Sequence, residues 1–225
     1  MNNNYFEIAR INMVKSQIMP VGVKKKDLLD SFYKIRRELF ISGNDRDLIY
    51  SDSDIRFSSD RYFMRSFLMA RMFEHCNFSK EDKVLVIGCL TGYSVAILSN
   101  LVGYVFAIEN DKKIVELANQ TLSEMSLLNC SVHYKNRLST GNSRNQPFDK
   151  IFIEGSVSHI PEKLVKQLKE DGEIYTVIKN IDEPVGFFVR GLKIKNDVSF
   201  TKIFNTNVCN LNDFTEVGDD YAPNN

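Results

Sequence analysis

The feature that most constrains the fold is an apolar segment that enters a glycine turn and is followed by a second apolar segment ending in an acid. Residues 84–87 read Val-Leu-Val-Ile, and residues 88–92 read Gly-Cys-Leu-Thr-Gly. Residues 105–108 read Val-Phe-Ala-Ile and lead to Glu109 and Asn110. A strand, glycine turn, helix, strand and acid in this order form the nucleotide pocket of a doubly wound sheet. The order therefore predicts a cofactor that carries a nucleoside, with its ribose hydroxyls on Glu109.

The turn differs from the fingerprint of dinucleotide-binding proteins. That fingerprint needs three glycines spaced GxGxxG, whereas this turn has only Gly88 and Gly92, with Leu90 where a tight turn favours glycine. No Gly-Lys-Ser/Thr sequence of a phosphate-binding loop follows. A ligand without phosphates, such as S-adenosylmethionine, therefore fits better than a dinucleotide or ATP. An ordinary β-α-β unit that binds no ligand is the alternative.

The composition indicates a globular protein with a sizeable core and no strong electrostatic partner. Of 225 residues, 43% are hydrophobic, and 29 Lys and Arg balance 29 Asp and Glu. This balance argues against nucleic acid or an anionic membrane as a partner. The four cysteines lack metal-ligand spacing, so no metal site is expected. We expect a cytoplasmic protein, because we find neither a signal-peptide pattern nor an apolar run of membrane length.

The periodicity of apolar residues predicts an α/β chain in three parts. Residues 1–78 form a helical extension with a substrate-side loop, residues 79–215 a Rossmann-like core, and residues 216–225 a flexible tail. Helices are predicted at 6–18, where Pro20 ends the helix, and at 25–37, 66–76, 94–101, 112–127 and 161–167. Strands are predicted at 84–87, 105–108, 130–134, 150–154 and 173–178, with an antiparallel pair at 185–191 and 198–204, whereas residues 46–61 are loop-like.

The predicted sheet brings several candidate residues to one edge. Ligands of such sheets bind outside the carboxyl ends of the strands, where Gly88, Glu109, Arg137 and Glu154 would lie. Cys89 would lie near a helix N-terminus that lowers thiol pKa values, although packing is the favoured role for its side chain. Asp149 begins its strand at the opposite edge and is expected to be structural.

Several segments, in a fixed order, resemble the protein-L-isoaspartate O-methyltransferases. The resemblance rests on Val84–Tyr93, Phe106–Asn110, Phe148–Pro161 and Leu168–Gly172, with Asn12–Val14 and Ile35–Phe40 upstream, and spans roughly Ile8 to Phe214. It implies the fold of a class I S-adenosylmethionine-dependent methyltransferase, with a doubly wound, mostly parallel sheet. It also implies an N-terminal helical part over the substrate site and a protein or peptide substrate whose carboxylate accepts the methyl group.

The resemblance also implies roles for individual residues. Gly88 and Gly92 would line the methionine end of the cofactor, and Glu109 would hold the ribose hydroxyls. Leu90 stands where the family has a second glycine, and Arg137 stands where the family has an acid near the adenine. The cofactor-binding candidates are Gly88, Cys89, Leu90, Gly92, Glu109, Asn110, Arg137 and Glu154.

The substrate loop departs from the family pattern. Asp60–Met64 matches the family's substrate loop, so Tyr62 and Met64 stand where hydroxyls would contact an isoaspartyl group. A phenol can donate a hydrogen bond, whereas a thioether cannot. Two alternatives to isoaspartyl methylation therefore stay open: a methyltransferase with a different acceptor, or an interaction module of this fold that has lost the cofactor. No catalytic residue and no oligomeric state is indicated.

Overall fold

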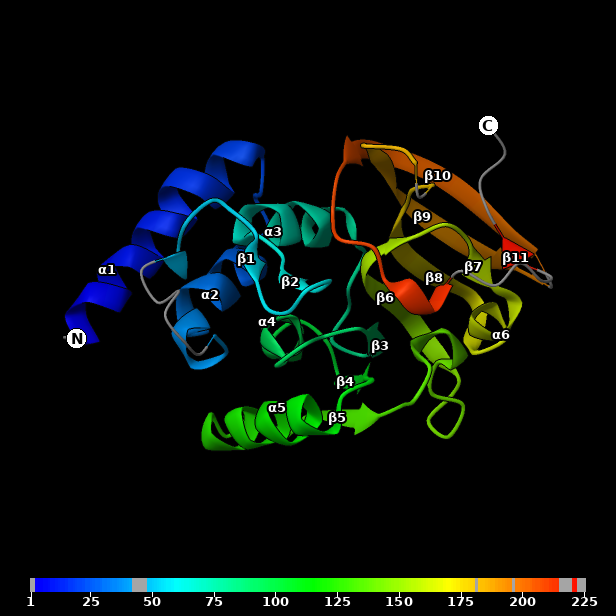
Figure 1. The fold of residues 1–225 in the computed structure, drawn as a ribbon, viewed down its shortest axis with the longest axis horizontal. Helices are drawn as coiled ribbons and strands as arrows, with labels where there is room; N and C mark the ends of the chain where they lie inside the picture. The colour runs from blue at the N-terminus through cyan, green and yellow to red at the C-terminus, as the bar shows by residue number, and fades with distance from the viewer. Residues whose placement is uncertain (1–2, 42–47, 181, 196, 215–219, 222–225) are drawn as a thin grey trace.

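A seven-stranded, mostly parallel sheet forms the centre of the protein (Figure 1). The computed structural model describes residues 3–41, 48–180, 182–195, 197–214 and 220–221. The strands lie in the order β10-β9-β8-β6-β3-β4-β5. Strand β9 is antiparallel to both of its neighbours, β8 and β10. Their bounds are β3 (Lys83–Ile87), β4 (Tyr104–Glu109), β5 (Cys130–Tyr134), β6 (Phe148–Val157), β8 (Leu168–Ile178), β9 (Gly186–Ile194) and β10 (Asp197–Thr206). The predicted doubly wound fold and its antiparallel pair are confirmed.

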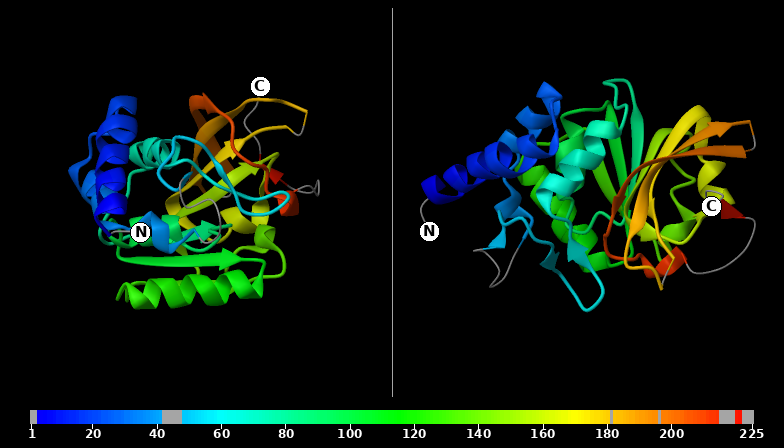
Figure 2. Two further views of the ribbon diagram at one scale, coloured as in Figure 1. Left: turned by 60° about the vertical axis from the view of Figure 1, so that its left-hand side comes forward. Right: turned by 90° about the horizontal axis from the view of Figure 1, so that it is seen from above.

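The two faces of the sheet pack against different elements. In β3, Val84 and Val86 belong to one buried cluster, whereas Leu85 and Ile87 belong to another. The first cluster includes α4 (Tyr93–Ser99), α5 (Lys112–Glu124) and the N-terminal helices; the second includes the short helix α6 (Glu162–Val165). Figure 2 shows these layers from two further directions. Strand side chains alternate between faces, so the apolar run of β3 is buried on both sides.

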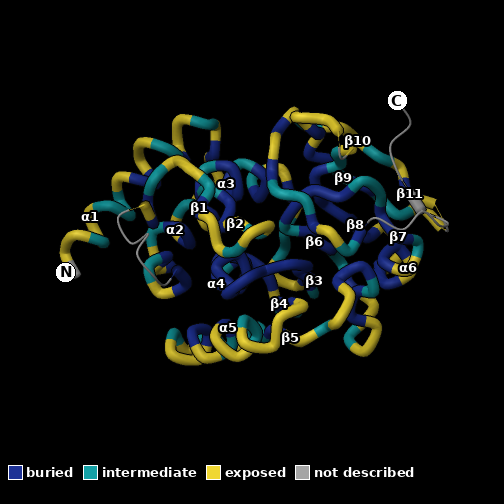
Figure 3. Tube along the Cα trace, viewed as in Figure 1, coloured by how far each residue is buried: buried dark blue, intermediate teal, exposed yellow. Residues whose placement is uncertain are grey.

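The N-terminal helices pack directly on the sheet's core rather than standing apart. They are α1 (Asn3–Met13), η1 (Val14–Ile18), η2 (Met19–Val21), α2 (Lys26–Lys34) and α3 (Ser66–His75). Phe32 and Met72 are buried in the same cluster as Val86. Figure 3 shows that the strands at the centre of the molecule are largely buried. The helix predicted at 6–18 ends at the expected residue, because η1 ends at Ile18. A separate 3-10 helix, η2, then carries Pro20 in its first turn, where the missing N–H costs nothing.

Several element boundaries differ from the sequence prediction. The segment predicted as loop, 46–61, contains the short strand β1 (Ile55–Arg56), which pairs antiparallel with β2 (Tyr62–Phe63) just after the segment. Residues 46–47 of it lie outside the described residues. The strand β6 continues beyond Glu154 to Val157. The predicted tail lies mostly outside the described residues, although β11 (Asp220–Tyr221) pairs with β7 (Ile160–Pro161). Such short pairings arise from tertiary contacts rather than from local periodicity.

Candidate functional site

Three neighbouring parallel strands bring the candidate residues to one edge of the sheet. The register pairs Ile87 of β3 with Ile108 of β4 and Ile153 of β6. The next residue on each strand is therefore at the same level, which places Gly88, Glu109 and Glu154 side by side at the carboxyl edge. These residues lie together, as predicted from the sequence, at the edge where open α/β sheets bind ligands.

The turn after β3 keeps a glycine-like backbone even though it contains a leucine. Gly88 and Gly92 have φ values of 79° and 92°, and Leu90 has a φ of 49° in the left-handed region. The Leu90 side chain is only 2% exposed and belongs to the first buried cluster. The isobutyl group of Leu90 therefore packs into the core.

Cys89 is buried in the same turn. Burial raises the pKa of the Cys89 thiol well above its usual range, and the neighbouring carboxylates of Glu109 and Glu154 act in the same direction. The suggestion that the helix N-terminus lowers this pKa is therefore wrong. An inert packing role agrees with a buried, protonated thiol.

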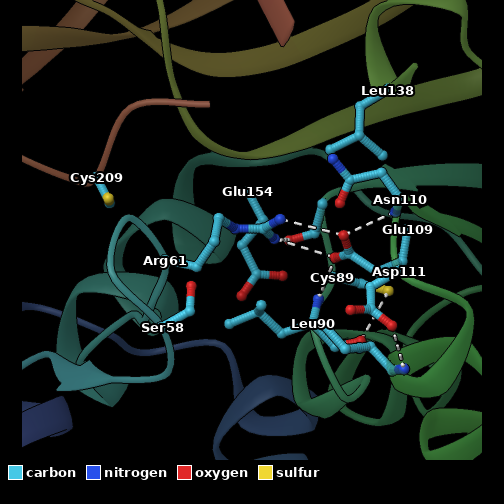
Figure 4. A network of polar contacts seen from close by, with 12 residues as sticks. Ser58, Arg61, Cys89, Leu90, Glu109, Asn110, Asp111, Leu138, Glu154 and Cys209 are labelled. Atoms are coloured by element: carbon cyan, nitrogen blue, oxygen red, sulfur yellow. Dashed lines mark hydrogen bonds and ion pairs between the residues drawn. The ribbon is translucent and has the colours of Figure 1, made fainter. Parts of the chain in front are cut away.

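Glu109 is a fully buried carboxylate at the end of β4, and all of its acceptor positions are occupied (Figure 4). Backbone N–H groups of Leu90 and Asn110 donate to Oε2 and Oε1, each at 2.9 Å. The guanidinium of Arg61 donates to Oε1 at 3.1 Å and to Oε2 at 3.0 Å. A carboxylate offers about four lone-pair positions, so these four bonds saturate Glu109.

Arg61 reaches Glu109 from the turn that precedes β2. Its backbone oxygen accepts hydrogen bonds from Phe57 and Ser58, which close the small β1–β2 hairpin. Its guanidinium also donates to the carbonyl oxygen of Gly88 at 3.0 Å. Burial lowers the pKa of Arg61, but the hydrogen bonds and charge of Glu109 outweigh burial and raise it overall. The ion pair is thus a charge-assisted, two-bond contact in a water-poor site.

A cavity of about 260 Å³ lies beside β4 and is called here the β4-side cavity. Its lining residues are Phe57, Ser58, Asp60, Arg61, Asn110, Asp111, Ile114, Leu138, Leu211, Asn212 and Asp213. Asp111 caps α5 by accepting hydrogen bonds from the backbone of Lys113 and Ile114. Arg137, the residue assigned to the adenine region, is exposed and is not part of this lining. The neighbouring Leu138 takes its place in the wall.

A smaller cavity of about 20 Å³ lies beside β6 and is called here the β6-side cavity. It is lined by Asp54, Arg61, Tyr62, Met64, Glu154, Gly155, Val208, Cys209 and Leu211. The structure therefore brings Tyr62 and Met64, the two candidate substrate-side residues, next to Glu154. Arg61 and Leu211 line both cavities.

Glu154 lies beside Arg61 (Figure 4). Its carboxylate accepts a hydrogen bond from the hydroxyl of Ser94 in α4. Burial, together with the charge of Glu109, raises the pKa of Glu154 to about 7, although Ser94, Arg61 and Arg37 act to lower it. A carboxyl group with this pKa changes its charge in the physiological range.

The segment after β10 covers the same edge of the sheet. The backbone N–H of Leu211 donates to the Ser156 carbonyl oxygen at 2.9 Å, and that of Ser156 donates to Cys209. A Cβ atom on Gly155 would lie 2.7 Å from Leu211 Cγ, and one on Gly88 would lie 3.2 Å from Leu211 Cδ1. These two glycines therefore allow Leu211 to pack against the strand ends.

Neither the position of Leu211 nor the ion pair of Arg61 follows from the sequence. Arg61 belongs to the predicted substrate loop, Asp60–Met64, and nothing in its position indicates a pairing with an acid 48 residues away. A weak signal was available: Glu109 is a carboxylate at the end of an apolar strand, and a buried carboxylate requires a donor or a cation.

The chain over residues 10–202 matches the sequence model of a family described as protein-L-isoaspartate(D-aspartate) O-methyltransferase. This protein belongs to that family. A Geobacter metallireducens protein-L-isoaspartate O-methyltransferase is 30% identical over 175 residues, which cover 78% of this chain and 81% of that protein. The protein of the same name from Protochlamydia amoebophila is 32% identical over 162 residues, covering 72% and 77% of the two chains. The family resemblance stated from the sequence is confirmed.

Two solved structures show the same fold. A protein-L-isoaspartate O-methyltransferase superposes with a TM-score of 0.79 at 24% identity, covering 90% of this chain and 65% of that chain. The second structure is a Plasmodium falciparum protein, described as a putative protein-L-isoaspartate O-methyltransferase in complex with S-adenosyl-L-homocysteine. It superposes with a TM-score of 0.74 at 17% identity, covering 95% of this chain and 100% of that chain. Family and fold together support S-adenosylmethionine as the cofactor.

The site fits such a cofactor in part. The β4-side cavity is lined by Asn110, which follows Glu109, and by Arg61, which pairs with Glu109. Two side chains occupy space that the cofactor would need: Arg61 holds the positions that ribose hydroxyls would take on Glu109, and Leu211 packs against Gly88. Within the described part of the chain, no cluster of three or more His, Cys, Asp or Glu could hold a metal ion, and none of the helices has the length and apolarity to cross a bilayer.

Proposed function

We propose that this protein transfers a methyl group from S-adenosylmethionine to the carboxylate of an isoaspartyl residue in a protein or peptide. The observation that carries the proposal is the edge formed by Gly88, Glu109 and Glu154 in a chain of this family. When bound, the cofactor would supply a methyl group that the acceptor oxygen takes as the sulfur–carbon bond breaks, leaving a methyl ester and S-adenosylhomocysteine.

The chain's own residues would act mainly by binding and orientation. Glu109 would hold the ribose, and Asn110, Asp111 and Leu138 would line the adenosine region. Tyr62 would donate a hydrogen bond to the acceptor from the β6-side cavity. No general base is required, because an isoaspartyl carboxylate is already ionised at pH 7. Positioning in an enclosed cavity can supply much of the rate acceleration.

The proposal is tested in two steps. The first is isothermal titration of the protein with S-adenosylmethionine and S-adenosylhomocysteine, for which we expect micromolar affinity. The second is methyl transfer from labelled cofactor to an isoaspartyl peptide, with the same peptide carrying ordinary aspartate as the control. Transfer to the isoaspartyl peptide alone supports the proposal.

Two other functions would give different results. Cofactor binding without transfer to the isoaspartyl peptide would favour another acceptor, for which Met64 in place of a hydroxyl is the motivating observation. Absence of cofactor binding at millimolar concentration would favour an interaction module, for which the Arg61–Glu109 ion pair is the motivating observation. Both outcomes contradict isoaspartyl methylation.

A further inference from the structure

One cation and two carboxylates share the edge of the sheet. Arg61 pairs with Glu109, and Glu154 lies on the other side of the same guanidinium (Figure 4). Among the residues that line the two cavities, Arg61 is the only cationic side chain. The other charged lining residues are the acids Asp54, Asp60, Asp111, Glu154 and Asp213. Arg61 therefore has a second anionic partner within its electrostatic range.

The four hydrogen bonds to Glu109 are of two kinds. The bonds from the Leu90 and Asn110 backbone are fixed by the turn after β3 and by the end of β4. The bonds from Arg61 come from a long side chain whose torsions can change while the β1–β2 hairpin stays in place. A ribose diol needs two acceptor positions on the carboxylate. Only the two positions held by Arg61 can be freed without changing the fold.

We propose that Arg61 competes with the cofactor for Glu109, and that it moves from Glu109 to Glu154 when S-adenosylmethionine binds. This inference rests on the proposed function and adds a control of affinity to it. The movement exchanges one charge-assisted pair for another, so a buried guanidinium is not left without a partner. The affinity for the cofactor then depends on the strength of the ion pair that Arg61 forms with Glu154.

The ionisation of Glu154 makes this exchange depend on pH. Four groups face its carboxyl from neighbouring elements: Ser94 of α4, Glu109 of β4, Arg37 of η3 (Arg37–Leu39) and Arg61. With Arg61 on Glu109, burial holds the pKa of Glu154 at about 7. Below this pH the carboxyl is neutral and attracts Arg61 weakly, whereas above it the carboxylate attracts Arg61 more strongly. We therefore expect the cofactor to bind more tightly at pH 8 than at pH 6.

The decisive variant is Arg61→Ala, measured by isothermal titration with S-adenosylmethionine at pH 8. If Arg61 competes with the cofactor, its removal should lower the Kd for S-adenosylmethionine at least threefold. If Arg61 instead contacts the cofactor, its removal should raise the Kd. An unchanged or higher Kd in a folded Arg61→Ala protein, verified by circular dichroism, would overturn the proposal.

Arg65→Gln is the matched control. Arg65 lies four residues along the same loop and pairs with Asp54 at 3.0 Å, not with Glu109. Its replacement perturbs a neighbouring ion pair without freeing the carboxylate at the end of β4. We expect an unchanged Kd, and equal tightening in both variants would show that a loosened loop, rather than competition at Glu109, is responsible.

A second variant tests the exchange even if Arg61→Ala fails to fold. Glu154→Gln removes the charge that receives Arg61, so the Kd at pH 8 should rise at least threefold. The difference between pH 6 and pH 8 should also disappear in this variant. A pH-independent Kd in the wild-type protein would overturn the movement to Glu154.

The failures of the two proposals are distinguishable. If the wild type binds the cofactor and Arg61→Ala binds it no more tightly, only the competition is wrong. If neither binds S-adenosylmethionine or S-adenosylhomocysteine at millimolar concentration, the cofactor itself is wrong and both proposals fall.

Discussion

The backbone N–H of Leu90 donates to Oε2 of Glu109 at 2.9 Å, which joins the glycine turn to the acid at the end of β4. The turn that carries this bond has a left-handed backbone at Leu90, where φ is 49°. The contact therefore explains how a leucine occupies a position that favours glycine: its backbone completes the Glu109 network while its side chain packs into the core.

We expect the stability of variants at position 90 to follow the order Leu, then Gly, then Ala. Loss of the buried side chain costs about 2–5 kcal/mol in either variant. Glycine recovers about 1 kcal/mol because it adopts the left-handed conformation without steric cost. Urea unfolding measures the order. If the alanine variant were more stable than the glycine variant, the turn would not be left-handed at this residue.

Glu109→Ala should weaken the binding of S-adenosylmethionine at least tenfold. The variant removes the acceptor that we assign to the ribose hydroxyls, and isothermal titration measures the effect. Glu109→Gln keeps the shape of the side chain and serves as a second variant in case the unpaired Arg61 disturbs folding. Wild-type affinity in both would refute the assignment of Glu109 to the ribose.

Glu154→Gln should stabilise the fold at pH 8 but not at pH 4.5. The pKa of Glu154 is about 7 in the fold, against an ordinary value of 4.5. A raised carboxyl pKa means that stability is lost as pH rises from about 4.5 to 7, by up to about 3 kcal/mol. Urea unfolding at both pH values measures the gain, with Glu116→Gln on the exposed face of α5 as control. No gain at pH 8 would contradict the raised pKa.

Asp149→Asn should lower stability without changing cofactor affinity. Asp149 lies at the opposite edge of the sheet, pairs with Lys169 at 2.6 Å and accepts a bond from the backbone of Lys83 at 2.8 Å. Partial burial alone would raise its pKa, but Lys169 and Lys83 lower it overall. The stabilisation is therefore present at neutral pH and is lost as pH falls below about 4.

We expect the free energy of unfolding of Asp149→Asn to be about 1 kcal/mol lower than that of the wild type at pH 7. This difference should shrink toward zero at pH 3. Thermal unfolding at both pH values measures it. The same protein titrated with S-adenosylmethionine should give the wild-type Kd. A large change in that Kd would mean that the two edges of the sheet are coupled, against the structural role predicted for Asp149.

Much of the fold follows from short-range patterns in the chain. The apolar runs of β3 and β4, the turn between Gly88 and Gly92 and the helix periodicity of α5 each encode an element locally. Boundaries were less accurate where tertiary contacts extend or shorten an element. Strand β6 continues past Glu154 because Ser156 and Val157 pair with the end of β8. Ser156 also bonds to the backbone of Cys209.

The sequence by itself determined the family, the succession of strands and helices along the chain and the edge where Gly88, Glu109 and Glu154 meet. Only the tertiary structure decided what those residues contact. The Arg61–Glu109 pair spans 48 positions, and Leu211 reaches Gly88 and Gly155 from the segment after the last strand of the sheet. Contacts of this kind leave no periodic signal, because they depend on where the folded sheet brings separate loops together. The buried charge of Glu109 requires a partner, and the fold places Arg61 where it can form the ion pair.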